Sequence, residues 1–202
     1  VACMEAGYDL LLEKPIANTE EECEIICVAA SRLGRKVIVC HVLRYTPFYR
    51  AVKRLLKEGA AGEIVTVEAS ENVGYYHQAH SFVRGPWRNS RESSPMILAK
   101  CCHDLDLLQY YAKSTCKSVS SVGDLTYFTA KNAPDGAAKR CLDCKYQDSC
   151  PYSAKTIYIE NWKNRGCPEN DWPYNILTLK LPLTEKALTE AVKNGPYGRC
   201  VF

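Results

Sequence analysis

The sequence has no long apolar run and no large excess of charge of one sign. Its longest uninterrupted apolar stretches contain a handful of residues, whereas a membrane-spanning helix needs about 18 to 20. The 26 basic and 23 acidic residues are scattered along the chain, without the basic stripe that marks a nucleic-acid surface. We therefore expect no membrane span and no nucleic-acid partner, and small-molecule chemistry is the favoured function.

A hydrophobic content of 47% over 202 residues excludes a disordered chain and suits one ordinary domain or two small ones. The chain opens at Val1 without an initiator methionine or the layout of a signal peptide. It closes on Arg199–Phe202, which resembles the beginning of a strand. We expect it to be a section of a longer chain.

Twelve cysteines could form a disulfide framework or stay reduced in the interior. Several occur at apolar positions: two on one face of a predicted helix, one at the end of an apolar run and two adjacent within another helix, namely Cys23, Cys27, Cys40, Cys101 and Cys102. Such positions favour small buried thiols. The cytoplasm is therefore the expected location.

The first part of the chain has the pattern of a strand–helix–strand unit. Apolar runs at 8–12 and 36–40 flank a helical pattern, which begins after Asn18–Thr19 and stops at Gly34. Two strands joined by a helix at this spacing predict a parallel βαβ unit with a right-handed crossover.

The second part mixes alternating and helical patterns. Residues 63–73 and 117–129 alternate in polarity and 175–181 is a further predicted strand, while helices are predicted over 47–58, 94–111 and 184–194. A polar, aromatic loop is predicted over 74–92 and a turn-rich, cysteine-bearing insertion over 132–152. The predicted fold is therefore α/β followed by α+β, with an open antiparallel sheet that has helices on one face.

Two places in this pattern could carry chemistry. Lys14 follows the first strand, at the edge where open α/β sheets bind ligands; the alternative is a surface lysine. On the helix over 94–111, Lys100, His103 and Asp104 share one face. The group suits a proton relay with His103 as its titrating member. The alternative is a core histidine beside a solvated Lys100–Asp104 pair.

The segment Gly74–Asn89 contains two histidines, two arginines and a row of aromatic residues. Such a segment suits a polyhydroxylated or nucleotide-like ligand. The alternative is a structural role, in which the aromatic side chains cover the sheet.

The insertion contains Cys141, Cys144 and Cys150, which have the spacing of three zinc-binding thiolates. Cys167 or Cys200 would then be the fourth ligand of a structural zinc site. Free cysteines and a disulfide are the alternatives.

Four motifs occur in order over roughly the first 125 residues: Glu13-Lys14-Pro15, HVLRY at 41–45, the segment at 74–89 that ends in HSFVRGPWRN, and HDLDLL at 103–108. Together they resemble the Gfo/Idh/MocA oxidoreductase family. Its members join a Rossmann dinucleotide-binding domain to an open antiparallel sheet, and they oxidise or reduce sugars and polyols with NAD or NADP. The resemblance implies the end of a Rossmann domain at 1–46, an incomplete α+β domain for substrate and oligomerisation at 47–202, and a homo-oligomer formed through the antiparallel sheet.

The resemblance also implies roles for individual residues. Lys14 matches the lysine near the nicotinamide and the substrate hydroxyl, and His103 matches the histidine of the active-site helix; either would act as general base. The expected cofactor-binding residues are Glu13, Lys14, Pro15, Trp87 and Arg88. The expected substrate-binding residues are Arg44, Tyr45, His77, His80, Lys100 and Asp104.

Two features depart from the family pattern. Many members have an aspartate four residues before the helix histidine, where this chain has Ala99, so either Lys100 or Asp104 substitutes or the chemistry differs. No G-x-G-x-x-G motif occurs; we expect that phosphate-binding loop to precede Val1, which would leave the fragment alone inactive. Two alternative functions stay open: an NAD-dependent glycoside-cleaving enzyme of the same fold, and a non-catalytic dimerising fragment.

Overall fold

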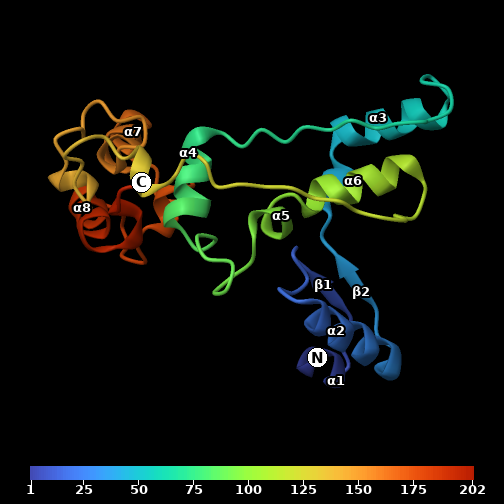
Figure 1. Cartoon of the computed structure of the whole chain (residues 1–202). Coiled ribbons are helices and arrows are strands. Elements are labelled where there is room, and N and C mark those ends of the chain that lie inside the picture. The colour runs from blue at the N-terminus through green and yellow to red at the C-terminus, as the bar shows by residue number, and fades with distance from the viewer. The chain divides into compact units, whose positions relative to one another are not determined.

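The computed structural model describes residues 1–202, which form two compact units (Figure 1). The first unit comprises Val1–Asn72 and Ser93–Ser120, and the second comprises Val73–Glu92 and Ser121–Phe202. Residues 1–46 lie wholly within the first unit. The domain boundary predicted after residue 46 stays a prediction.

The predicted βαβ unit is confirmed at the start of the first unit. Strands β1 (Leu10–Leu12) and β2 (Val37–Val39) pair in parallel, and helix α2 (Glu20–Leu33) connects them. Thr19 caps α2 in a capping box with Glu22, and Gly34 ends the helix at a left-handed φ of 60°. A short helix, α1 (Ala2–Glu5), packs against α2.

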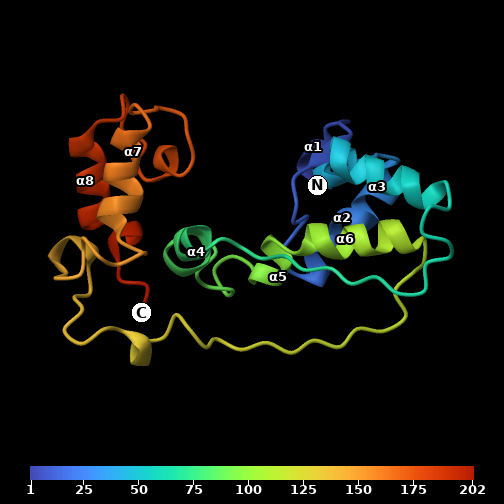
Figure 2. The same cartoon turned by 90° about the horizontal axis from the view of Figure 1, so that it is seen from above.

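Helices α3 (Pro47–Lys57), α5 (Met96–Ala99) and α6 (Cys102–Ala112) complete the first unit. Helix α3 lies beside α6 in both views (Figures 1 and 2), where the Tyr111 hydroxyl donates to the Tyr49 carbonyl oxygen at 3.4 Å. The single helix predicted over 94–111 is interrupted, because the backbone at Lys100 turns to φ −115°. The interruption leaves the Ala99 carbonyl at a helix end, where it is open to a side-chain donor.

The predicted open antiparallel sheet is not present in the structure. Strands β1 and β2 form its one sheet, and the single antiparallel contact is an isolated bridge between Arg140 and Arg199. Residues 63–73 and 117–129 are drawn without strand arrows (Figure 2), and 175–181 is also not a strand. A strand requires a hydrogen-bonded neighbour, which polarity alternation alone cannot supply. Homo-oligomer formation through such a sheet stays a prediction.

The predicted loop over 74–92 is largely helical. Helix α4 (Tyr75–His77) continues into a π-helical stretch, Gln78–Arg84. Ala79, His80 and Arg84 are almost fully buried, and this burial outweighs the weak local helix signal. The second unit also contains α7 (Asn161–Asn164), which follows a π-turn at Thr156–Glu160, and the predicted helix α8 (Glu185–Asn194) with its cap Thr184.

Most of the core lies in the second unit, where three clusters of buried side chains include Tyr158, Trp162, Tyr174, Leu188 and Val192. In the first unit the buried apolar residues are Met4, Ala29, Ala99 and Leu107. None of the helices has the length and apolar character needed to cross a membrane.

The prediction that five cysteines are buried is wrong. Cys27 is exposed, and the other four (Cys23, Cys40, Cys101 and Cys102) are half-buried. On α2 the apolar side chains of Ile25 and Val28 are also exposed, because no further element of the first unit covers that face. Cys141 is the one buried cysteine.

We expect Gly198→Ala to destabilise the second unit. A Cβ at this position would lie 1.7 Å from the Val192 carbonyl oxygen, so α8 and the chain after it would have to separate, at a cost on the order of 2–4 kcal/mol. Urea unfolding followed by tryptophan fluorescence measures the change. Gly123→Ala is the control, since nothing lies within 4 Å of a Cβ there; equal stability of the two variants would contradict the prediction.

Candidate functional site

Lys14 and His41 lie at the same edge of the small parallel sheet. Lys14 follows β1 and His41 follows β2, and the carboxyl ends of parallel strands meet at one edge, where ligands bind in α/β folds. The Lys14 ammonium donates to the Ala99 carbonyl oxygen at 2.7 Å. The end of α5 therefore fixes the position of Lys14.

His103 reaches the same place from the first turn of α6. It is 9% exposed, and its ring meets that of His41 edge to face at 5.8 Å between centroids. Burial lowers the pKa of His103, and the electrostatic effects of Lys14 and His41 lower it further. Neither His41 nor His103 has a hydrogen-bond partner at Nδ1. A neutral imidazole in this position can accept a proton at neutral pH.

Asp106 connects α6 to the segment after β2. Its carboxylate accepts hydrogen bonds from Arg44 Nε at 2.7 Å and Nη2 at 2.5 Å, and it lies 3.8 Å from His41 Nδ1. The hydrogen bond to Asp106 raises the pKa of Arg44, whose guanidinium also lies over the Tyr110 ring at 4.7 Å. Arg44, predicted to bind substrate, is thus held by a carboxylate, whereas Tyr45 is 72% exposed.

Lys100 pairs with Glu71 and not with Asp104. The Lys100 ammonium lies 2.8 Å from the Glu71 carboxylate, and this hydrogen bond raises the pKa of Lys100. The Lys100–Asp104 pair that we considered as an alternative does not form. Asp104 instead has a buried carboxylate oxygen, Oδ2, without a hydrogen-bond partner.

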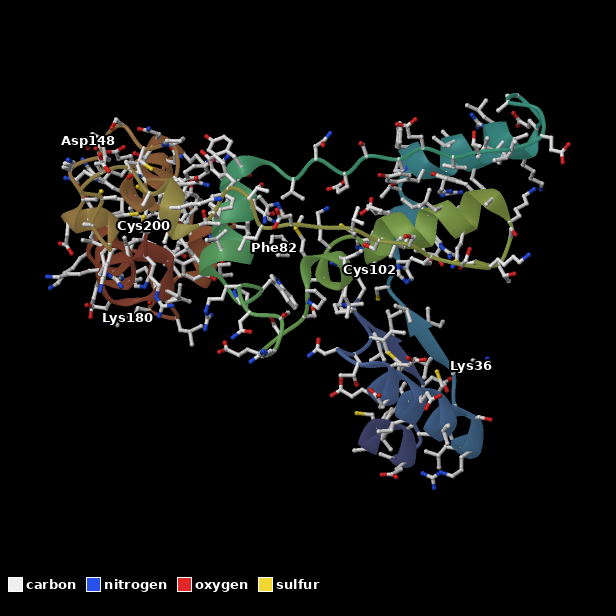
Figure 3. The ribbon with its side chains drawn as sticks, viewed as in Figure 1. Lys36, Phe82, Cys102, Asp148, Lys180 and Cys200 are labelled. Carbon is white, nitrogen blue, oxygen red and sulfur yellow. The ribbon has the colours of Figure 1, made fainter.

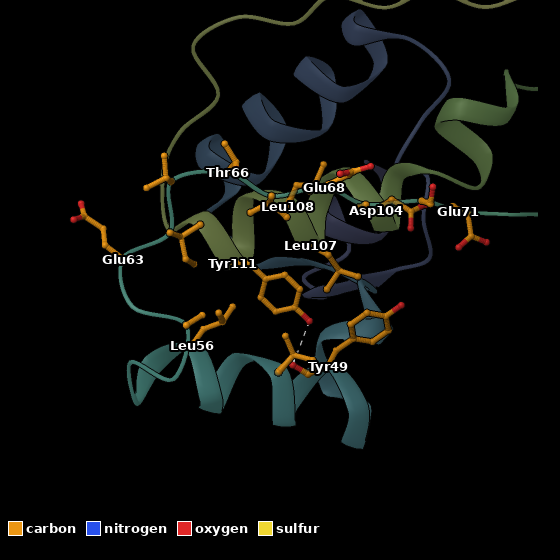
Figure 4. Close-up of a pocket in the computed structure, with 17 residues that line it drawn as sticks. Tyr49, Leu56, Glu63, Thr66, Glu68, Glu71, Asp104, Leu107, Leu108 and Tyr111 are labelled. Atoms are coloured by element: carbon orange, nitrogen blue, oxygen red, sulfur yellow. Dashed lines mark hydrogen bonds between the residues drawn. The ribbon is translucent and has the colours of Figure 1, made fainter.

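A cavity of about 640 Å³ lies between α3, α6 and residues 63–71 (Figure 4). Its walls are mainly apolar, with Tyr49, Leu56 and Leu107 among them, and Glu71 and Asp104 also line it. Lys14, His41 and His103 do not line this cavity. We therefore place the candidate site at the sheet edge and not in the cavity.

His80 belongs to the interior of the second unit. It is 0% exposed, its Nδ1 lies 2.8 Å from the Tyr158 hydroxyl, and its ring stacks on Tyr197 at 4.7 Å. Burial lowers the pKa of His80 to about 4, so this side chain is neutral near pH 7. These contacts favour the structural alternative for His80 over a role in binding substrate.

The other predicted site residues of the second unit lie nearer its surface. His77 packs against Trp172 at 5.0 Å between ring centroids, Trp87 is half-buried, and Arg88 pairs with Glu92 at 3.0 Å. In the first unit, Glu13 is exposed and Pro15 is half-buried. The cofactor-binding roles of Glu13, Pro15, Trp87 and Arg88 stay predictions.

The predicted zinc site is not assembled from its three cysteines in this structure. No three Cys, His, Asp or Glu side chains are grouped as a metal site, and all twelve cysteines are free. The Cys141 sulfur instead accepts from Arg84 Nη2 at 3.2 Å and donates to the Arg199 carbonyl oxygen at 3.8 Å.

Sequence reasoning assigned no role to His41, Asp106 or Glu71. His41 follows the second parallel strand, as Lys14 follows the first, and this shared edge was a usable signal. Asp106 is three residues after His103, a spacing that places both on neighbouring parts of a helix surface. Glu71 is distant from Lys100 in the sequence, so no local pattern predicts that pair.

Comparison with known proteins gives one family match. Residues 49–139 match the family model of the GFO/IDH/MocA C-terminal domain. The chain is similar to YteT of Bacillus subtilis (strain 168), named as an oxidoreductase, with 26% identity over 77% of this chain and 37% of YteT. No solved structure matches the chain.

Two further relatives differ in the reaction that they are named for. The inositol 2-dehydrogenase 2 of Saccharopolyspora erythraea is 36% identical over 54% of this chain and 30% of the relative. The 2,7-anhydro-N-acetylneuraminate hydratase of Escherichia coli (strain K12) is 27% identical over 55% of this chain and 29% of the relative. The chain therefore spans about a third of the length of the relatives that it matches.

We expect Asp106→Asn to loosen α6. The change removes the charge of a buried carboxylate from a half-buried pair and weakens its hold on Arg44, which costs about 1–3 kcal/mol. The free energy of opening, measured by hydrogen exchange of the α6 amides, reports the effect. Glu58→Gln is the control, because it removes an exposed pair with Arg54 at 3.8 Å and should cost less than about 0.5 kcal/mol. Equal protection of the α6 amides against hydrogen exchange in both variants would show that Asp106 does not stabilise α6.

Proposed function

We propose that this chain, whose residues 49–139 match the C-terminal domain of the Gfo/Idh/MocA family, is part of an oxidoreductase that transfers a hydride between NAD or NADP and a hydroxyl-bearing carbon of a sugar or polyol. The observation that carries this proposal is the grouping of Lys14, His41 and His103 at the carboxyl edge of two parallel strands. The similarity to inositol dehydrogenases supports a polyol as substrate.

The residues at this edge fit the nicotinamide end of such a cofactor. Two imidazole nitrogens, on His41 and His103, are buried without hydrogen-bond partners, and Lys14 presents an ammonium group beside them. Glu13, Lys14 and Pro15 would hold the cofactor at this edge. When bound, the nicotinamide supplies the hydride-transfer chemistry.

In this proposal two side chains, His103 and Lys14, act on the hydroxyl group of the substrate. Neutral His103 accepts the proton of the substrate hydroxyl, and the Lys14 ammonium donates a hydrogen bond to the same oxygen as negative charge develops on it. The Ala99 carbonyl oxygen accepts a hydrogen bond from Lys14 and so positions it. The family resemblance implies that many relatives have an aspartate at the position of Ala99. Asp106 in turn positions Arg44 and lies 3.8 Å from His41 Nδ1.

A second candidate function uses the same residues without net oxidation. Some relatives would oxidise a sugar only transiently, so that a glycosidic bond can be eliminated. The similarity to a 2,7-anhydro-N-acetylneuraminate hydratase and the alanine at position 99 favour keeping this candidate.

Two assays of the protein encoded by the complete reading frame separate the two functions. A dehydrogenase accumulates NADH or NADPH when NAD or NADP is supplied with inositols and common sugars. A glycoside-cleaving enzyme releases nitrophenol from nitrophenyl sugars while no reduced nucleotide accumulates. Binding of NADH or NADPH without either turnover would count against both.

We expect His103→Asn to lower kcat/KM by about 10²- to 10⁴-fold, as for loss of a general base. In the unchanged enzyme the acid limb of kcat/KM against pH should lie below the ordinary pKa of histidine, because burial and Lys14 lower the pKa of His103 and so keep the base neutral to lower pH. Gln109→Ala, an exposed change on the same helix, is the control. An unchanged acid limb in His103→Asn would exclude His103 as the base.

A further inference from the structure

We propose that the second unit contains a structural zinc site, in which Cys141, Cys144, Cys150 and Cys200 bind one ion beside the buried guanidinium of Arg84. The site shares no residue with the oxidoreductase chemistry proposed above, and all five of its residues belong to the second unit. Four thiolates are a usual ligand set of closed zinc sites.

A single small cavity brings these residues together. All four cysteines and Arg84 line it, and its volume is about 30 Å³. The four thiols therefore share one cavity, as the ligands of a single metal ion must.

The structure identifies Cys200 as the fourth ligand. The backbone N–H of Cys200 donates to the Lys139 carbonyl oxygen at 2.9 Å, next to the bridge between Arg140 and Arg199. These contacts hold Cys200, labelled in Figure 3, against the chain that leads into Cys141. Cys167 is exposed in the turn after α7 and does not line the cavity.

Tight turns present the other thiols. A 3₁₀ turn over Cys141–Asp143 is closed by the Cys144 N–H, which donates to the Cys141 carbonyl oxygen at 3.2 Å. A second turn is closed by the Cys150 N–H, which donates to the Tyr146 carbonyl oxygen at 2.9 Å. The turns between Cys141, Cys144 and Cys150 therefore bring these three cysteines to the same cavity.

Arg84 provides an observation that is independent of the cysteines. It is 1% exposed, its Nη1 is buried without a hydrogen-bond partner, and none of the ion pairs of the structure includes it. Its other donors reach the Arg199 and Tyr152 carbonyl oxygens and the Cys141 sulfur. A buried charge without a counter-charge is costly. Four thiolates on Zn²⁺ carry a net charge of about −2, which would supply that counter-charge.

Binding requires movement of side chains but no oxidation or reduction. The sulfur atoms are not grouped closely enough to hold an ion as they stand, so the half-buried Cys144, Cys150 and Cys200 must turn toward the buried Cys141 to reach Zn–S distances of about 2.3 Å. Four thiols lose their protons to solvent, and four Zn–S bonds replace the bonds between Zn²⁺ and its water ligands, which are released.

Metal content of the whole chain tests the proposal. We expect about one zinc per chain after expression with added ZnSO₄, desalting and elemental analysis by mass spectrometry. Cys200→Ser should lose most of this zinc, while Cys167→Ser, the matched control, should keep it. No zinc in the unchanged chain, or equal loss from both variants, would overturn the proposal.

A second measurement does not depend on the folding of variants. Replacement of zinc by Co²⁺ in the unchanged chain should give the absorption bands of tetrahedral cobalt together with strong thiolate-to-cobalt charge transfer. Octahedral cobalt bands without charge transfer would refute the site. Co-purified iron and inorganic sulfide in place of zinc would also refute it, because the cavity would then hold a cluster.

Discussion

The carboxylate of Asp106 is the contact on which the arrangement of the candidate site depends. It accepts hydrogen bonds from Arg44 Nε and Nη2 and lies beside His41. Helix α6 is therefore connected to the segment that follows β2. Since His103 is on the same helix, this tie also sets where its ring meets that of His41. A first unit with few buried apolar residues depends strongly on such a polar connection.

The second unit has a comparable centre in Arg84. Its guanidinium reaches Cys141, Tyr152 and Arg199, all of which are distant from Arg84 in the sequence. A buried guanidinium is expensive to desolvate, so it is retained only where its donors and its charge are compensated. Carbonyl oxygens satisfy most of the donors, and the charge still needs an anion. The first unit thus compensates its Arg44 guanidinium with a carboxylate, whereas the second unit surrounds Arg84 with carbonyl oxygens and the Cys141 sulfur.

Local chemistry made part of the fold predictable. The capping box at Thr19, the left-handed Gly34 and the helix start at Pro47 each act within one turn of backbone, so sequence alone locates these helix ends. The alternating segments were misleading for the opposite reason, because a strand exists only when another segment pairs with it. The π-helical stretch before Gly85 was missed because its stability comes from burial of Ala79, His80 and Arg84 and not from local propensity.

The sequence by itself determined the family resemblance, the βαβ order and the identities of Lys14 and His103 as site candidates, since motifs and helix ends are properties of neighbouring residues. Only the tertiary structure decided the partners. It paired Lys100 with Glu71, engaged Arg44 with Asp106, buried His80, and placed Cys200 rather than Cys167 beside Cys141. Each of these choices joins residues distant in the chain, and the spacing of residues along a chain does not specify which distant segments meet.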